Sequence, residues 1–147
     1  RRFAVTRREW VHDVVQEAVA LPSRAILVGH GTGAWVVAHA LHRYPALAGV
    51  LVEPTGLPGR RLPGAGVLLR RPMIGLTLLL GRDPRVPAAM PPMLIAAGDR
   101  FPRKVLADQA VRYGARSERL PVSGHGALPA IDPVLDWLEK SSPSGSS

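Results

Sequence analysis

The fold of this chain is decided by residues 25–35, which read AILVGHGTGAW. The stretch opens with four apolar residues in a row, which is typical of a strand buried on both faces of a parallel sheet. Three glycines follow at alternate positions, Gly29, Gly31 and Gly33. Closely spaced glycines allow the backbone to turn sharply and to pack closely against its neighbours. We therefore expect a buried strand that turns directly into a helix.

Helix and strand signals alternate along the rest of the chain. The expected strands are 25–28, 49–52, 93–97 and 117–122, and the expected helices are 6–20, 33–43, one short helix within 74–80, 104–113 and 131–140. This alternation predicts an α/β fold with a mostly parallel sheet of about four strands between two layers of helices.

The length of 147 residues predicts a single domain, because such a chain supports one hydrophobic core. We expect the domain to span residues 1–140, with a short Pro/Gly-rich insertion at about 54–92. The Ser/Gly-rich segment 141–147 is expected to be a disordered tail. The apolar runs are too short to span a bilayer. No signal peptide is recognised near residue 1, so a cytoplasmic location is expected.

The absence of cysteine excludes a disulfide framework, a zinc ribbon and a cysteine nucleophile. The net charge of +8 suggests nucleic acid at first sight. However, the arginines are scattered, few aromatic residues lie among them, and no recognition-module signature is present. We therefore do not expect nucleic-acid binding.

The glycine turn is compatible with two chemistries. In the nucleophile elbow G-x-S-x-G, residues 29–33 supply the frame and Gly31 occupies the position of the nucleophile. In the dinucleotide fingerprint G-x-G-x-x-G/A, Gly29, Gly31 and Ala34 supply the pattern. Glu53 then stands at the end of the next strand, where a ribose-binding carboxylate would be expected.

The C-terminal third of the sequence favours the nucleophile elbow over the dinucleotide fingerprint. Gly98-Asp99 ends the third strand, and His125 lies in the glycine-flanked loop 122–126, after the last strand. An acid and then a histidine therefore follow the elbow, which is the chain order of the Ser-Asp-His triad on this type of sheet. A dinucleotide-binding domain has no need of this pair.

With these motifs, residues 9–140 resemble the α/β-hydrolase superfamily, in particular serine esterases and lipases. The resemblance rests on the segments 26–30, 37–41, 92–100 and 123–126. It implies ester or related acyl hydrolysis of a small-molecule substrate, with no cofactor and no metal. It also implies His125 as the base, Asp99 as the acid and the backbone amide of Thr32 as an oxyanion donor.

The chain departs from the family pattern in three places. Gly31 has no side chain to attack a carbonyl, so activity is expected to be weak or absent. The strands that usually precede the elbow, with their oxyanion donor, are expected to be missing. Phe101 stands where similar sequences often place the acid, so the acid is Asp99, or Glu53, or is absent.

Two further expectations concern binding. Without preceding strands, residues 25–28 become an apolar edge strand, which favours a homodimer or a partner covering that edge. The alternatives to a hydrolase are a dinucleotide-binding module and a non-catalytic interaction domain. We expect the three tryptophans to be core or sheet-covering anchors: Trp10, Trp35 and Trp137.

Overall fold

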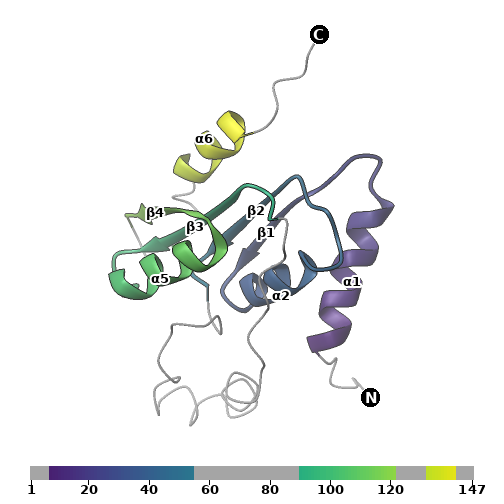
Figure 1. Cartoon of the computed structure of the whole chain (residues 1–147), viewed down its shortest axis with the longest axis horizontal. Coiled ribbons are helices and arrows are strands. Elements are labelled where there is room, and N and C mark those ends of the chain that lie inside the picture. Colours follow the sequence, from purple (N-terminus) through teal and green to yellow (C-terminus); the bar gives the residue numbers. More distant parts are fainter. Residues whose placement is uncertain (1–6, 55–89, 122–131, 142–147) are drawn as a thin grey trace.

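The computed structural model describes residues 7–54, 90–121 and 132–141 (Figure 1). Its four strands form one parallel sheet in the order β1-β2-β3-β4. The strands are β1 (Ile26–His30), β2 (Ala48–Val52), β3 (Met93–Gly98) and β4 (Arg116–Leu120), and the helices are α1 (Arg7–Ala20), α2 (Thr32–Ala40), α5 (Arg103–Tyr113) and α6 (Asp132–Ser141). The expected α/β class and parallel sheet are confirmed.

The observed boundaries differ from the expected ones where strand pairing decides them. β1 runs two residues further than expected, through Gly29 and His30, because both residues stay in register with Leu51 and Val52 of β2. β4 ends at Leu120, which is the last residue in register with β3. The expected short helix within 74–80 and the histidine loop lie outside the described residues.

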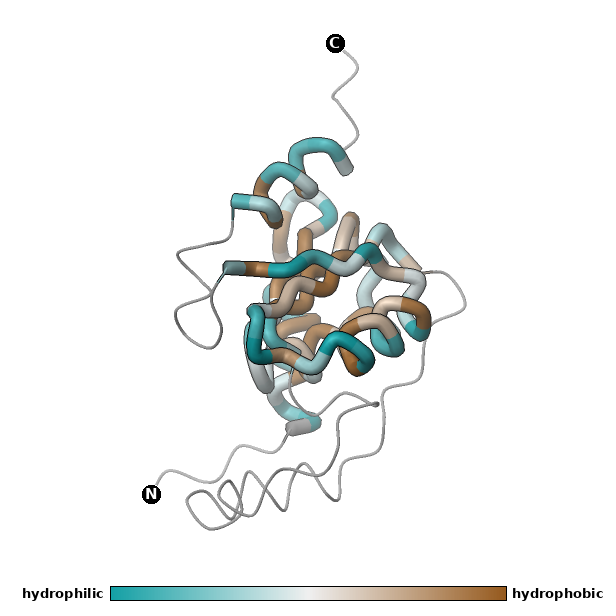
Figure 2. The backbone as a smooth tube through the Cα atoms, turned by 90° about the vertical axis from the view of Figure 1, so that its left-hand side faces the viewer, coloured by the Kyte–Doolittle hydropathy of each residue, from teal (hydrophilic) through white to brown (hydrophobic). Residues whose placement is uncertain are grey.

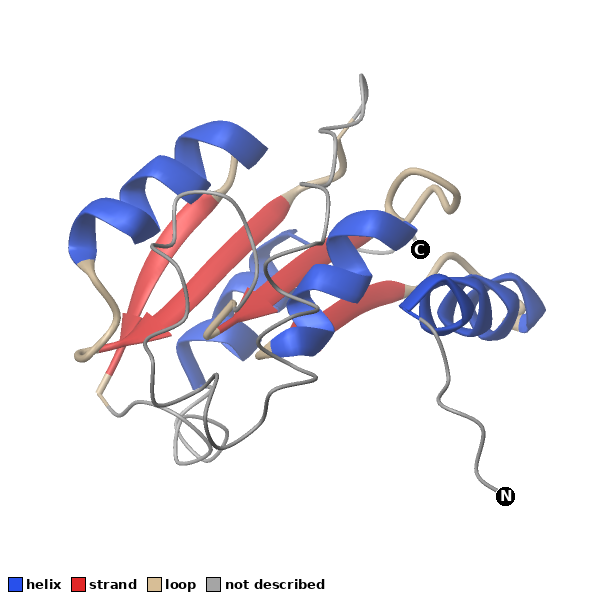
Figure 3. Cartoon of the chain, turned by 90° about the horizontal axis from the view of Figure 1, so that it is seen from below, coloured by secondary structure: helices blue, strands red, loops and turns tan. Residues whose placement is uncertain are grey.

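Helices cover the two faces of the sheet unequally (Figure 3). On one face, α1, α2 and α5 share a core with alternate residues of β1 to β3. On the other face, α6 packs through Val134 and Trp137 against the intervening residues of β2, β3 and β4. Hydrophobic residues accordingly gather inside the molecule (Figure 2). The three layers thus follow from strands that are apolar on both faces.

The two central strands are buried along their whole length. This explains why their sequences show no alternation of polar and apolar residues. β4 is an edge strand whose residues 116–119 are polar or charged and at least partly exposed. β1 forms the opposite edge of the described sheet.

The tryptophans do not all behave as expected. Trp137 is buried in the core beneath α6 and Trp35 packs partly buried against the other core, as predicted. The prediction was wrong for Trp10, whose side chain is 45% exposed on α1. Trp10 is exposed because α1 lies beyond the edge of the described sheet (Figures 1 and 3). Within the described ranges, no helix combines the length and apolarity needed to cross a membrane.

Candidate active site

The first part of the candidate site is the turn from β1 into α2. Gly31 joins the two elements with φ 58° and ψ −118°, and it is the N-cap residue of α2. Its N–H donates a hydrogen bond to the Val52 carbonyl of β2 at 2.9 Å. L-residues rarely adopt this backbone conformation, and the strained turn of a nucleophile elbow uses such a position. The segment therefore has the backbone of an elbow.

The glycines of the turn have different structural roles. A Cβ atom on Gly29 would lie 2.5 Å from the carbonyl oxygen of Gly33, so only glycine allows α2 to start this close to β1. A Cβ on Gly31 would meet no atom within 4 Å. A side chain at position 31 would thus enter open space. Thr32 follows as the first residue of α2, and N–H groups of a first helical turn have no partner inside the helix.

The second part of the site is the end of β2. Glu53 has φ 48°, and it is the one described residue besides glycine with a positive φ. Its Oε1 atom accepts a hydrogen bond from the Gly98 N–H at 2.6 Å, and its own N–H donates to the Ala96 carbonyl at 2.8 Å. The half-buried carboxylate is therefore directed at the end of β3.

The third part is the turn after β3, residues 99–101, which carries Asp99 and is called the acid turn below. The Asp99 side chain is exposed and its Oδ1 atom accepts a hydrogen bond from the Arg100 N–H at 2.8 Å. Arg119 of β4 holds this turn from the other side, because its Nη1 atom donates to the carbonyls of Gly98 and Phe101. Arg119 was not among the predicted site residues, because a charged residue in a polar edge strand carries no sequence signal for such a contact.

The sheet brings three of the predicted site residues to one edge, since carboxyl ends of parallel strands lie together. Gly31 bonds to the residue before Glu53, and Glu53 bonds to the residue before Asp99. The chain of contacts therefore runs from the elbow to the acid turn. His125, the predicted base, lies outside the described residues, and its distance to either carboxylate stays untested.

The same geometry bears on the alternative chemistries. The dinucleotide fingerprint needs the carboxylate after β2 to be available to a ribose. The Glu53 carboxylate instead binds the backbone of β3. No group of three or more His, Asp or Glu side chains that could hold a metal ion is found in residues 7–54, 90–121 and 132–141.

Comparison with known proteins identifies the fold. No protein-family model and no curated protein matches the sequence. Among solved structures, the chain is similar to a thermophilic esterase at 16% identity and a TM-score of 0.67, over 95% of this chain and 75% of that one. An α/β hydrolase from Sphaerobacter thermophilus matches at 17% identity and a TM-score of 0.56, over 90% of this chain and 74% of that one.

A third similar structure is a thermophilic esterase from the Planctomycetes species Thermogutta terrifontis, solved with propionate bound. It matches at 20% identity and a TM-score of 0.53, over 96% of this chain and 65% of that one. At these identities the likeness shows the fold alone. The four parallel strands and their helices therefore form an α/β fold of the type found in α/β hydrolases, and the comparisons do not favour a dinucleotide-binding module.

Proposed function

We propose that residues 29–33 form the nucleophile elbow of a carboxylic-ester or related acyl hydrolase in which Gly31 occupies the nucleophile position. The observation that carries the proposal is the backbone conformation of Gly31, φ 58° and ψ −118°, at a strand-to-helix turn. The esterases among the similar structures support the reaction class. The substrate is then a small ester, and the chain as written hydrolyses it weakly or not at all.

The chemistry of such a site assigns a role to each residue. A serine hydroxyl at position 31 would attack the ester carbonyl, and His125 would take its proton. The Thr32 amide would donate to the resulting oxyanion. Glu53 or Asp99 would orient the histidine. With Gly31 in place, no atom is available for the attack.

The test is to restore the nucleophile by Gly31→Ser. The new Cβ meets no neighbour within 4 Å, so the cost is the strain of the positive φ, about 1–3 kcal/mol. We expect the variant to react with a fluorophosphonate, because the serine oxygen displaces fluoride from phosphorus. Slow turnover of an activated aryl ester should accompany the labelling. Loss of one oxyanion donor lowers turnover on the order of 10²–10³-fold.

Two control variants match this substitution. Gly33→Ser places the same hydroxyl two residues further on, where a Cβ also meets no atom within 4 Å. Gly114→Ser introduces the same side chain at another positive φ, 57°, remote from the elbow at the C-cap of α5. Neither should be labelled. A folded Gly31→Ser variant that takes no label would refute the hydrolase proposal and favour a non-catalytic interaction domain.

The Gly31→Ser background also assigns the base and the acid. Adding His125→Ala should abolish labelling, because the hydroxyl loses its base. Glu53→Gln and Asp99→Asn are then added separately. Only the substitution of the residue that orients the histidine should lower the rate of labelling. Equal, unchanged rates in both would mean that the site has no acid.

A further inference from the structure

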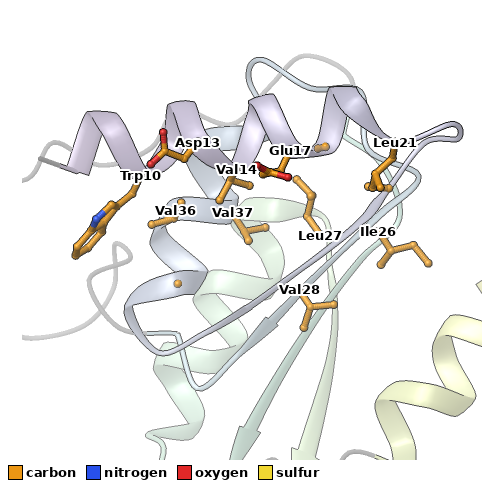
Figure 4. Close-up of a pocket in the computed structure, with 13 residues that line it drawn as sticks. Trp10, Asp13, Val14, Glu17, Leu21, Ile26, Leu27, Val28, Val36 and Val37 are labelled. Atoms are coloured by element: carbon orange, nitrogen blue, oxygen red, sulfur yellow. The ribbon is translucent and has the colours of Figure 1, made fainter. Parts of the chain in front are cut away.

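The two edge strands of the described sheet differ in chemical character. Beside β1 lies a groove whose walls are mainly apolar side chains of α1, β1 and α2 (Figure 4). β4, at the opposite edge, has the sequence Arg-Ser-Glu-Arg-Leu over residues 116–120 and is therefore charged. The helices that pack on β4 are α5 and α6, which lie on the two faces of the sheet. Between them, within the described residues, the outer edge of β4 has no partner strand.

The open edge of β4 is a regular strand. All five of its residues stay in register with β3, so it contains no bulge, and none of the five is proline. Bulges and prolines are common devices by which proteins prevent pairing at an open edge, and charged side chains are another. Of these devices β4 has only the charges, so their arrangement decides what can pair with it.

The charges of β4 are arranged symmetrically about Ser117. Arg116 and Glu118 flank it, and they lie on the same face of the sheet as Leu120, which packs in the core beneath α6. The Arg116 Nε atom lies 3.9 Å from the Glu118 Oε2 atom, and the two side chains are 67% and 33% exposed. Both charged groups are therefore accessible to a strand that adds to this edge.

A second copy of β4 matches this arrangement. Around a two-fold axis perpendicular to the sheet, two β4 strands pair antiparallel and every residue keeps its face, so residues that stand opposite must share a face. The axis therefore passes through a residue. At Arg116, Glu118 or Arg119 the axis would set two like charges opposite each other. At Ser117 it sets Arg116 opposite the partner's Glu118, and it does so twice.

The helices leave room for this pairing. α5 packs on both β3 and β4, so its axis lies about one strand spacing, 4.8 Å, from the two-fold axis. The two copies of α5 then lie about 10 Å apart, which is close to the usual 8–10 Å between packed helices. α6 packs on β2, β3 and β4 of the other face, so it lies further from the axis than α5 and its two copies stay apart.

We propose that two copies of this chain pair through β4 into a two-fold dimer, with one continuous sheet built from the four described strands of each copy. Arg116 of each copy forms an ion pair with the partner's Glu118, and each β4 satisfies the open N–H and C=O groups of the other. Each elbow lies on β1, at the far side of its sheet from the interface. The proposal is independent of the proposed hydrolase function.

The test reverses the two charges in separate variants and measures dimerisation by sedimentation equilibrium. Arg116→Glu sets like negative charges opposite each other, and Glu118→Arg sets like positive charges opposite each other. Each variant alone should therefore dimerise at least about tenfold more weakly than the unsubstituted chain. An equimolar mixture should regain the affinity as a heterodimer, because the opposite charges then face each other between the copies. The ion pair within one strand is lost in both variants, so the mixture reports the contact between copies alone.

Two matched variants carry the same changes of charge far from β4. Arg24→Glu lies before β1 and Glu17→Arg lies on α1, and both positions are exposed. Both variants should dimerise as tightly as the unsubstituted chain. Circular dichroism of each variant shows that a loss of dimer is not a loss of folding.

A cysteine crosslink tests the register. The chain contains no cysteine, so Ser117→Cys introduces a single thiol on the proposed axis. Directly opposite residues of antiparallel strands have Cα atoms about 4.5–5.5 Å apart, which is within the range that a disulfide spans. Mild oxidation should link the Ser117→Cys variant into covalent dimers at least about tenfold faster than Ser23→Cys, a matched variant at an exposed serine before β1.

Four results would overturn the proposal. The first is a monomer at the highest soluble concentration of the unsubstituted chain. The second is a dimer that persists in both charge variants, which would place the interface elsewhere, for example at residues 25–28. The third is a mixture of the two charge variants that stays monomeric. The fourth is equally fast crosslinking of the two cysteine variants, which would show random collision rather than pairing in this register.

Discussion

The elbow geometry makes a graded prediction for alanine at the three glycines of the turn. Gly29→Ala places a Cβ 2.5 Å from the Gly33 oxygen, 2.6 Å from its carbonyl carbon and 2.7 Å from the Ala34 Cα. All three atoms are backbone, so no side chain can rotate away. Carbon contacts are favourable only at about 3.5–4.0 Å, so the start of α2 must move by about 1 Å. We expect a loss of about 3 kcal/mol, the upper end of the usual cost of overpacking.

The other two substitutions calibrate this loss. At Gly31 the Cβ is unobstructed but the strained backbone with φ 58° is retained, so Gly31→Ala should cost about 2 kcal/mol, within the usual range for a strained residue. At Gly33 a Cβ meets no close neighbour and φ is not positive. Alanine in the first turn of α2 should therefore raise the free energy of unfolding by up to about 1 kcal/mol. The expected order of stability is therefore Gly33→Ala, the unsubstituted chain, Gly31→Ala and Gly29→Ala.

The assay is equilibrium unfolding in urea, followed by circular dichroism so that the tryptophans are not needed as probes. Midpoints should follow the stated order at a constant m-value. A Gly29→Ala variant as stable as Gly33→Ala would show that α2 does not start against β1. The elbow, and with it the proposed hydrolase site, would then be refuted.

Three further substitutions test side-chain hydrogen bonds to the backbone at the ends of β1 and β3, each by urea unfolding. Tyr44→Phe removes the hydroxyl that accepts the Ala25 N–H at 2.6 Å, and it should cost about 1–2 kcal/mol; an unchanged midpoint would contradict this bond. Glu53→Ala leaves the buried Gly98 N–H without its acceptor and should cost about 2 kcal/mol, whereas Glu53→Gln keeps an acceptor and should cost less than half of that. Arg119→Met removes the two hydrogen bonds that Nη1 donates to the acid turn and should cost about 1–2 kcal/mol, with faster amide exchange at Gly98; equal exchange would show that Arg119 does not hold the turn.

The sequence alone predicted the order of the elements and the parallel sheet. Short runs such as 93–97 are apolar at every position, which indicates strands buried on both faces, and such strands require helices on either side. The sharp turn from strand to helix was predicted as well, because closely spaced glycines allow it, and Gly29 is the position at which a Cβ would meet the backbone of α2. Residues 30, 98 and 120 show the limit of this reasoning, since strand ends depend on the neighbouring strand rather than on local composition.

The tertiary structure alone decided how the candidate site is built. The hydrogen bond from Gly98 to Glu53 joins residues 45 positions apart, and no local pattern encodes such a contact. The contact of Arg119 with the acid turn exists only because β4 pairs with β3. Trp10 lies on the apolar face of its helix, yet it is exposed because α1 extends beyond the last described strand. Periodicity shows which face of a helix is apolar, but only the packing of the whole chain determines whether anything covers it.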